Sequence, residues 1–120
     1  MKYRVAFELL YFCGLRRGEL LALTWKHINF DTNELSIKQN LVENRLEGGY
    51  LITSPKTRSS IRTIPLFNKL VEDLKELKEK DSFDTSIIGT IEVMFKDGSK
   101  EYVSRRRVKD VMRKIKEWGN

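Results

Sequence analysis

The stretch GLRRGELLAL, residues 14–23, places two adjacent arginines, Arg16 and Arg17, between a glycine and an apolar run. Upstream of it, apolar residues recur at spacings of three and four over residues 3–13, which predicts a helix with a wide apolar face that ends at the glycine. Downstream, residues 18–24 predict a second short helix. The two arginines therefore lie at the N-terminus of a helix that must be half buried, and their charge needs an explanation.

The composition of the chain limits what it is. With 120 residues, of which 40% are hydrophobic, it is long enough for one small domain with a modest core, and we expect a single domain over residues 1–120. Lysine and arginine outnumber aspartate and glutamate by 23 to 17, which gives a net charge of +6. This surplus favours a polyanionic partner, although a generally basic surface accounts for the same number.

Three short runs in the middle of the chain predict strands. Residues 34–39 alternate between apolar and polar side chains, and two further apolar runs follow at residues 50–53 and 61–65. The loop SPKTRSS, residues 54–60, separates the last two, which predicts an antiparallel hairpin with a long, exposed, basic tip. We expect an α+β fold in which helices pack on a small three-stranded antiparallel sheet.

Two further helices are expected in the second half of the chain. Residues 67–77 predict an amphipathic helix whose polar face is rich in lysine and glutamate. Residues 104–118 predict a last helix with Ser104 as its N-cap, and its polar face holds seven basic residues against two acidic ones. Charge concentrated on one helix indicates a directed contact with a polyanion. Residues 81–103 leave two alternatives open, a hairpin around an Asp-Gly pair or an extended loop.

The residue counts disfavour several classes of site. A single cysteine, Cys13, lies in an apolar helical run and allows no disulfide framework, which is typical of a reducing compartment. With one histidine, His27, the chain has too few ligands for a zinc site and no Cys/His catalytic pair. No apolar run approaches the roughly 18 residues of a membrane span. We therefore expect a cytoplasmic protein with no metal, no small-molecule cofactor and no membrane contact.

Two basic residues are the candidates for chemistry. Arg16 stands where a helix begins, so its guanidinium and nearby backbone N–H groups are placed to converge on one anion, with Glu19 one turn on to orient it. The alternative is a surface Arg-Glu pair, which is common and weak. Lys56 lies on the loop between two strands, where it is suited to donate a proton or to contact a phosphate. A loop lysine that merely aids solubility is the alternative.

Two motifs together carry a resemblance to a known family. GLRRGELLALTWKHINF, residues 14–30, is followed by PKTRSSIRTIPL, residues 55–66. In this order and spacing they resemble the N-terminal part of the catalytic domain of the tyrosine recombinases, the phage integrase family. The resemblance covers at least residues 3–80 and includes the connecting stretch TWKHINFDTNELSI, residues 24–37. It implies a partial recombinase catalytic domain that acts on DNA.

The resemblance also implies roles for individual residues. Arg16 matches the first catalytic arginine, which holds the scissile phosphate in the family. Glu19 matches the acidic residue that supports this arginine, and Lys56 matches the lysine that acts as general acid toward the leaving 5′ oxygen. Further contacts to the DNA backbone are expected from six basic residues: Arg17, Arg58, Arg62, Arg105, Arg106 and Lys109.

The chain departs from the family pattern at its C-terminal end. The family's His-x-x-Arg box and nucleophilic tyrosine are lacking, since no histidine follows His27 and the last tyrosine, Tyr102, precedes the basic helix. Tyr102 is expected to be a packing or turn residue. We expect a piece of an integrase, truncated before the box, that binds DNA and cleaves nothing. The full enzyme is expected to self-associate on attachment-site DNA and to form a 3′-phosphotyrosine link without metal or ATP.

Two rival interpretations remain at this point. The chain is alternatively a complete, non-catalytic DNA-binding accessory or remnant domain, which contacts phosphates through residues 56–62 and 105–116. The other rival is a protein-interaction module whose basic helix docks on an acidic partner. That rival predicts that substitutions of Arg16 and Lys56 leave the function untouched.

Overall fold

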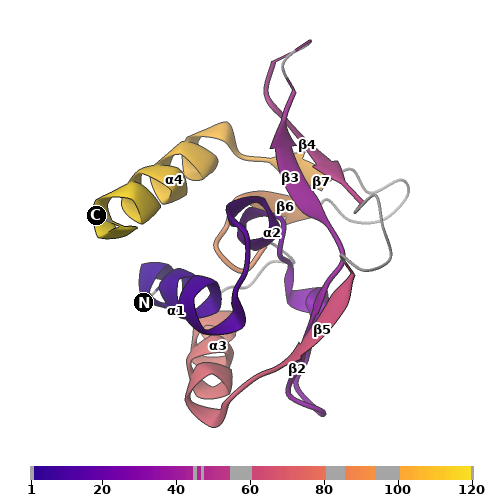
Figure 1. The fold of residues 1–120 in the computed structure, drawn as a ribbon, viewed down its shortest axis with the longest axis vertical. Helices are drawn as coiled ribbons and strands as arrows, with labels where there is room; N and C mark the ends of the chain where they lie inside the picture. The colour runs from indigo at the N-terminus through magenta and orange to yellow at the C-terminus, as the bar shows by residue number, and fades with distance from the viewer. Residues whose placement is uncertain are drawn as a thin grey trace.

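The computed structural model of the protein describes residues 2–44, 46, 48–54, 61–80, 86–93 and 101–119. Within them, helices and strands follow in the order α1 (Lys2–Cys13), α2 (Arg17–Leu21), the 3-10 turn η1 (Trp25–His27), β1 (Ile28–Asn29), β2 (Glu34–Ile37), β3 (Asn40–Glu43), β4 (Tyr50–Thr53), β5 (Arg62–Pro65), α3 (Asn68–Lys80), β6 (Ile91–Val93), β7 (Glu101–Val103) and α4 (Arg105–Gly119). Figure 1 shows α1, α3 and α4 gathered on one side of the molecule and strands β2 to β5 on the other. The expected α+β class is confirmed.

The three-stranded antiparallel sheet has the order β1-β2-β5. In its register, Leu35 of β2 lies between Ile28 of β1 and Ile64 of β5. Leu35 and Ile37 are both buried, as the alternation of the strand requires, because residues two apart point to the same face. The sheet therefore presents one apolar face to the helices, and its polar face lies toward solvent.

The predicted hairpin between residues 50–53 and 61–65 is wrong. Strand β4 pairs with β3, with Thr53 of β4 opposite Asn40 of β3. Strand β5 pairs instead with β2. The expected strand at residues 34–39 ends at Ile37, and a new strand, which the sequence analysis missed, begins at Asn40. The Gln39 side chain marks this break, since its Nε2 donates to the carbonyl of Ala22 at 2.7 Å. Strands β2 and β3, which follow each other along the chain, therefore pair with different strands, β5 and β4.

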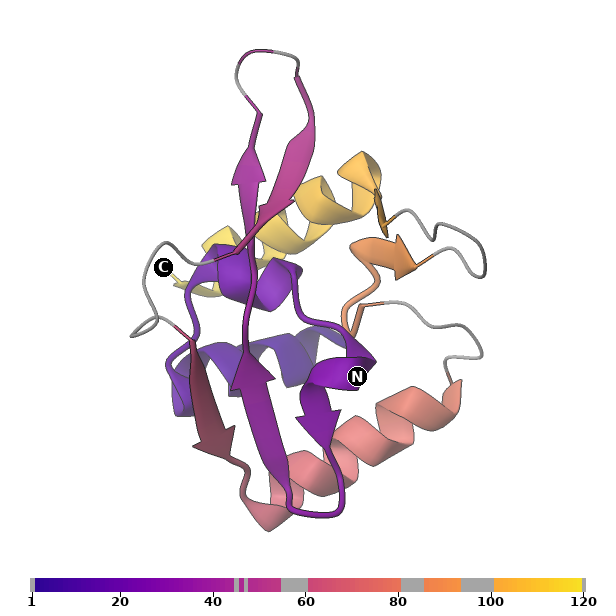
Figure 2. The ribbon, with the colours of Figure 1, turned by 90° about the vertical axis from the view of Figure 1, so that its right-hand side faces the viewer.

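The β3–β4 pair forms a hairpin of its own. Gly48 and Gly49 both have positive φ, of 80° and 81°, which glycine adopts without steric cost. The turn is closed by two backbone hydrogen bonds of 2.8 Å, one from Asn44 N to the Gly49 carbonyl and one from Gly48 N to the Asn44 carbonyl. The hairpin projects from the end of the molecule where α4 lies, and the three-stranded sheet and α3 lie at the other end (Figures 1 and 2).

Helices α1 and α3 pack against each other beside the sheet. Helix α1 buries Val5 and Leu9, and it ends at Cys13, directly before Gly14, whose φ is 65°, as its sequence predicts. Helix α3 buries Leu70 and Leu74 on the stripe that the sequence indicated. The apolar faces of both helices therefore contribute to one continuous core with the buried face of β2.

The segment after α2 is tied to a distant part of the chain. The helix expected at residues 18–24 ends at Leu21, and η1 follows. Thr24 forms an isolated antiparallel bridge with Ser86, and the Leu23 carbonyl accepts a hydrogen bond of 3.0 Å from Ile87 N. These non-local bonds replace the helical ones, which is why the helix is shorter than its local pattern suggests.

The end of the chain forms a strand pair and a helix. Strands β6 and β7 pair antiparallel, so of the two alternatives for this region the hairpin is found; the Asp-Gly pair itself lies outside the described residues. Tyr102 lies within β7, opposite Glu92. Ser104 caps α4, since its Oγ accepts a hydrogen bond of 3.3 Å from Arg107 N. Helix α4 buries Val108 and Val111 and exposes a basic face.

Candidate nucleic-acid interface

Arg16 is the N-cap of α2, with extended backbone angles of φ −78° and ψ 155°. Its backbone N–H donates to Glu19 Oε1 at 2.9 Å, so this N–H is already used and is not available to an anion. The side chain is exposed, and no hydrogen bond or ion pair joins the guanidinium to another residue that the structure describes. The backbone of Arg16 is thus fixed by the cap while its guanidinium faces solvent.

Glu19 has a second and stronger partner in Arg62. The Arg62 guanidinium donates to both carboxylate oxygens of Glu19, at 2.9 Å each, and its Nη2 also lies 3.4 Å from the carbonyl of Gly14. The Glu19 side chain is 7% exposed and that of Arg62 is 34% exposed. Hydrogen bonding to Arg62 lowers the pKa of Glu19, and the same contact raises the pKa of Arg62.

This contact gives Glu19 a second partner that the sequence did not suggest. Glu19 holds Arg16 through its backbone N–H, and the guanidinium that it orients belongs to Arg62. The predicted DNA contact of Arg62 stays a prediction. The Glu19–Arg62 pair therefore connects Gly14, which follows α1, with the cap of α2 and strand β5. The local spacing of Arg16 and Glu19 gave no sign of a partner 43 residues away.

Gly18 lets α2 approach strand β3 closely. A Cβ atom at this position would lie 2.6 Å from the Leu41 carbonyl oxygen and would overlap the Asn40 side chain. No other amino acid therefore fits without displacing the strand. The close approach fixes the arginines at the start of α2 relative to the β3–β4 hairpin.

Two predicted site residues, Lys56 and Arg58, lie outside the described residues. The structure does place the strands on either side of them. Their segment leaves β4 after Thr53 and enters β5 at Arg62, and these two strands belong to different sheets. The two hydrogen bonds between Arg62 and Glu19, called the Arg62–Glu19 clamp below, therefore hold the start of β5 next to α2.

The basic face of α4 lies beside the β3–β4 hairpin. Arg105, Arg106 and Lys109 are exposed, as predicted. Arg105 packs on the turn of the hairpin, because a Cβ atom on Gly49 would lie only 2.7 Å from Arg105 Nη2. The structure also brings Lys109 and Arg17 to the walls of one pocket, although they lie far apart in the sequence.

The identity of the protein family follows from a match along almost the whole chain. The model of the phage integrase family matches residues 1–119. The chain belongs to the phage integrase family. The resemblance that rested on two motifs is thereby confirmed.

Individual relatives of this phage integrase chain are longer than it is. It is 34% identical over 77 residues to the ICEBs1 integrase of Bacillus subtilis strain 168, across 64% of this chain and 20% of the relative. It is 31% identical over 109 residues to a tyrosine recombinase XerC-like protein of Caldanaerobacter subterraneus subsp. tengcongensis, across 85% of this chain and 27% of the relative. The chain thus spans well under half of either protein.

A solved structure supports the same relationship. The Tn1549 transposon integrase, in complex with circular intermediate DNA, superposes on the phage integrase chain with a TM-score of 0.64 at 25% identity. The superposition covers 98% of this chain and 39% of that one. The Tn1549 integrase therefore shares this arrangement of helices and small antiparallel sheets.

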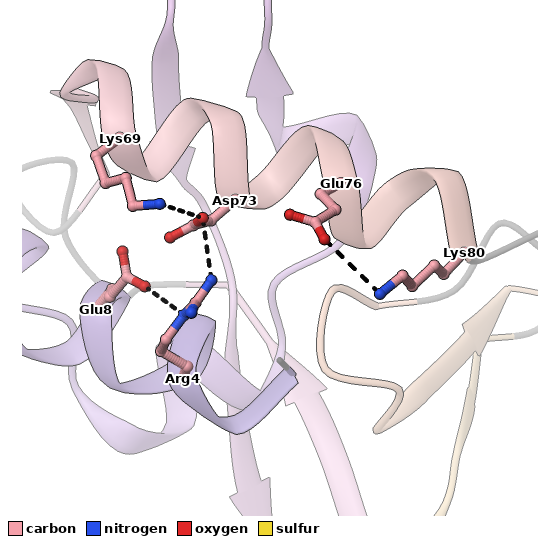
Figure 3. Close-up of polar contacts among 6 residues, drawn as sticks. All are labelled: Arg4, Glu8, Lys69, Asp73, Glu76 and Lys80. Atoms are coloured by element: carbon pink, nitrogen blue, oxygen red, sulfur yellow. Dashed lines mark hydrogen bonds and ion pairs between the residues drawn. The ribbon is translucent and has the colours of Figure 1, made fainter.

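A charged cluster between α1 and α3 of the phage integrase chain was missed by the sequence analysis (Figure 3). The Asp73 side chain is only 3% exposed, and its Oδ1 accepts from Arg4 Nη2 at 3.2 Å and from Lys69 Nζ at 3.3 Å. Arg4 Nε also lies 3.5 Å from Glu8 Oε1. The signal was present in the sequence, because Asp73 falls three residues after Leu70, on the buried stripe of the helix.

Burial and mutual contact set the pKa values of this carboxylate pair. Burial and the hydrogen bond to Asp73 raise the pKa of Glu8. Burial by itself would raise the pKa of Asp73 as well, but hydrogen bonds from Glu8 and Lys69 hold it below its ordinary value. Asp73 Oδ2 is buried without a hydrogen-bond partner among the residues that the structure describes. Of the two carboxyl groups, Glu8 is therefore the one whose protonation is favoured.

Three findings bear on metals and membranes. Among the residues that the structure describes, no group of histidine, cysteine, aspartate or glutamate side chains is arranged to hold a metal ion. Burial lowers the pKa of His27 to about 4, and its Nδ1 accepts a hydrogen bond of 3.2 Å from Thr24 N, so it is a neutral, internally bonded histidine. In the same described part of the chain, no helix has the length and apolar character that a membrane crossing requires.

Proposed function

We propose that this chain binds double-stranded DNA and positions the scissile phosphate for a site-specific recombinase, which cleaves and rejoins strands through a 3′-phosphotyrosine. Membership of the phage integrase family supports the proposal, as do relatives that are named integrase and recombinase and a similar structure that contains DNA. The partner is DNA of the attachment-site type, encountered in the cytoplasm, and the complete recombinase self-associates on it.

The observation that carries the proposal is the state of Arg16. Its backbone is fixed by the Glu19 carboxylate at 2.9 Å, while its guanidinium is exposed and forms no hydrogen bond or ion pair with another described residue. A prearranged guanidinium donates two parallel hydrogen bonds to phosphate oxygens and stabilises the charge that develops on them during attack at phosphorus. A structural arginine would instead resemble Arg62, whose guanidinium is paired with Glu19.

Lys56 is the proposed general acid. When the tyrosine oxygen attacks phosphorus, the bond from phosphorus to the 5′ oxygen breaks, and the leaving oxygen takes a proton. Lys56 supplies that proton from the segment between β4 and β5. The Arg62–Glu19 clamp supports this role, because it holds β5 against the helix whose first residue follows Arg16.

The 120-residue chain by itself is proposed to bind DNA without cutting it. Its sequence has no histidine after His27, and its last tyrosine, Tyr102, lies in a paired strand. Neither the His-x-x-Arg box nor the nucleophilic tyrosine of the family is therefore among these residues. The proposed contribution of this chain is phosphate binding by Arg16, proton donation by Lys56 and backbone contacts by its other basic residues.

Binding of a fluorescent duplex, followed by anisotropy over a series of salt concentrations, tests this function. Affinity is expected to fall linearly with salt on logarithmic axes, and Arg16→Gln is expected to weaken binding and reduce the slope by about one. Lys80→Gln is the matched control, because Lys80 lies at the end of α3 with an exposed side chain paired to Glu76. A chain without affinity for duplex DNA overturns the proposal, and a covalent adduct with DNA contradicts the non-cutting role.

The catalytic assignments are tested in a recombinase that carries this chain together with a nucleophilic tyrosine. Lys56→Ala is expected to slow strand cleavage while leaving DNA binding nearly intact. A substrate with sulfur in place of the leaving 5′ oxygen should restore the rate, because a thiolate leaves without a proton. Arg16→Ala should not be restored in this way, since its loss affects the phosphoryl oxygens. Equal rescue of both variants would contradict the separate roles.

A further inference from the structure

A pocket of about 330 Å³ opens between α2, the β3–β4 hairpin and α4. Arg17 is the first residue of α2, Tyr50 is the first residue of β4, and the rest of the wall comes from one face of α4. The lining residues are Arg17, Tyr50, Lys109, Met112, Arg113 and Lys116. Nothing in the family motifs of the sequence pointed to this site, which draws on three separate elements.

The lining is strongly positive. Four of the six lining residues are basic and none is acidic. One of the four, Arg113, has its Nη2 3.7 Å from the Asp110 carboxylate, in an exposed pair that contributes little. The concave arrangement concentrates the remaining field, so the pocket favours an anion.

The two lining residues that are not basic, Tyr50 and Met112, favour a ligand that has an apolar or aromatic part as well as a phosphate. Tyr50 and Met112 are both half-buried and supply an aromatic ring and a polarizable thioether. The volume lies at the lower end of the range of small-molecule sites. A basic groove combined with an aromatic side chain is the arrangement by which proteins hold unpaired nucleotides, whose bases are free to stack. In a duplex the bases stack on one another, and only phosphate would reach such a pocket.

We propose that this pocket binds one unpaired nucleotide of a DNA strand. Its phosphate lies among Arg17, Lys109 and Lys116, and its base or sugar packs on Tyr50 and Met112. The inference rests on the proposed function, since a DNA-binding chain is the one that meets unpaired DNA. Because Arg17 directly follows Arg16, the nucleotide lies next to the site where the phosphate is to be cleaved.

The three methionines of the chain allow a direct test. With methionine methyl groups labelled by carbon-13, the Met112 signal, assigned with Met112→Leu, is followed during titration with thymidine 5′-monophosphate. A saturable shift of this signal is expected, with much weaker effects from thymidine or inorganic phosphate alone. Tyr50→Ala should weaken binding at least about fivefold. Tyr11→Ala is the matched control, because Tyr11 is 79% exposed on α1 and takes no part in the pocket.

Competition separates unpaired from duplex DNA as the source of the nucleotide. A short thymidine oligonucleotide is expected to displace the monophosphate, whereas a blunt duplex is not. Inorganic phosphate that binds as tightly as the monophosphate, or a duplex that competes as well as the single strand, would overturn the proposal. A silent Met112 in a chain that still binds duplex DNA would overturn this inference and leave the proposed function standing. A shift of the Met112 signal that depends on Tyr50, in a chain that binds no duplex DNA, would overturn the proposed function and leave the nucleotide pocket standing.

Discussion

The Arg62 guanidinium donates one hydrogen bond to each oxygen of the Glu19 carboxylate, and both measure 2.9 Å. Because Glu19 Oε1 also accepts from Arg16 N, the two residues connect strand β5 with the cap of α2. The pair stands at the boundary between the core and the proposed DNA-binding surface. It holds strand β5 next to α2 and Arg16, so its loss should affect both stability and function.

Arg62→Gln is expected to destabilise the protein by about 2 kcal/mol, because it leaves the carboxylate of Glu19 nearly buried without its partner. The expected loss is smaller than for a fully buried pair, since Arg62 is one-third exposed. Urea unfolding at pH 7 measures it. The double variant with Glu19→Gln should recover part of the loss, because no buried charge is then left unpaired. Additive losses would show that the two residues do not act together.

The same pair predicts a pH dependence at the acidic end. Since the pKa of Glu19 is lowered in the folded protein, its contribution is fully present above the ordinary value of 4.5 and is lost as the pH falls through the lower folded value. Unfolding free energies measured between pH 6 and pH 3 should therefore fall less steeply in Arg62→Gln than in the parent protein. Parallel curves for the two proteins would count against this linkage.

His27 predicts a second loss of stability in a higher pH window. Burial, with smaller effects of Lys26 and Lys38, lowers its pKa from 6.5 to about 4. Between these values the unfolded chain binds a proton that the folded chain does not, so stability is complete above pH 6.5 and falls toward pH 4, by about 3 kcal/mol at most. A proton NMR titration of the single histidine measures the pKa directly. A midpoint close to 6.5 in the folded protein would refute the prediction.

Glu8→Gln is expected to preserve or raise stability at pH 7. An amide at this position is expected to donate a hydrogen bond to the buried Asp73 Oδ2, which has no partner among the described residues, and it avoids the burial of a second negative charge next to Asp73. Figure 3 shows Glu8 and Asp73 facing each other between α1 and α3. The advantage over the parent protein should vanish at acidic pH, where Glu8 carries its own proton. Glu76→Gln is the control, because Glu76 forms an exposed pair with Lys80. A clear destabilisation by Glu8→Gln at pH 7 would show that Glu8 acts chiefly as a partner of Arg4.

Gly18→Ala is expected to cost about 1–3 kcal/mol, although alanine is the better helix former. The added methyl group would press on the Leu41 carbonyl and the Asn40 side chain, so α2 must move away from β3. Gly14→Asn is a useful contrast, because its positive φ is tolerated by asparagine and nothing lies within 4 Å of an added Cβ. Thermal unfolding of both variants decides the matter. An unchanged Tm for Gly18→Ala would show that the strand yields freely.

Part of the fold follows from patterns within a few residues. Helices were predicted at residues 3–13, 67–77 and 104–118, close to their observed bounds, because apolar spacing and caps depend on neighbours along the chain. The same holds for the two motifs around Arg16 and Lys56, whose order and spacing carried the resemblance to the phage integrases. The roles of these two residues stay predictions, and Lys56 lies outside the described residues.

The sequence by itself determined the helices, the surplus of positive charge and the family. Only the tertiary structure decided that β4 pairs with β3, that Glu19 meets Arg62, and that Tyr50 joins Arg17 in one pocket. The physical reason is that short strands share one side-chain period, so several pairings fit the same pattern. An ion pair or a pocket between distant segments depends on how the whole chain packs, and residue spacing does not contain that information.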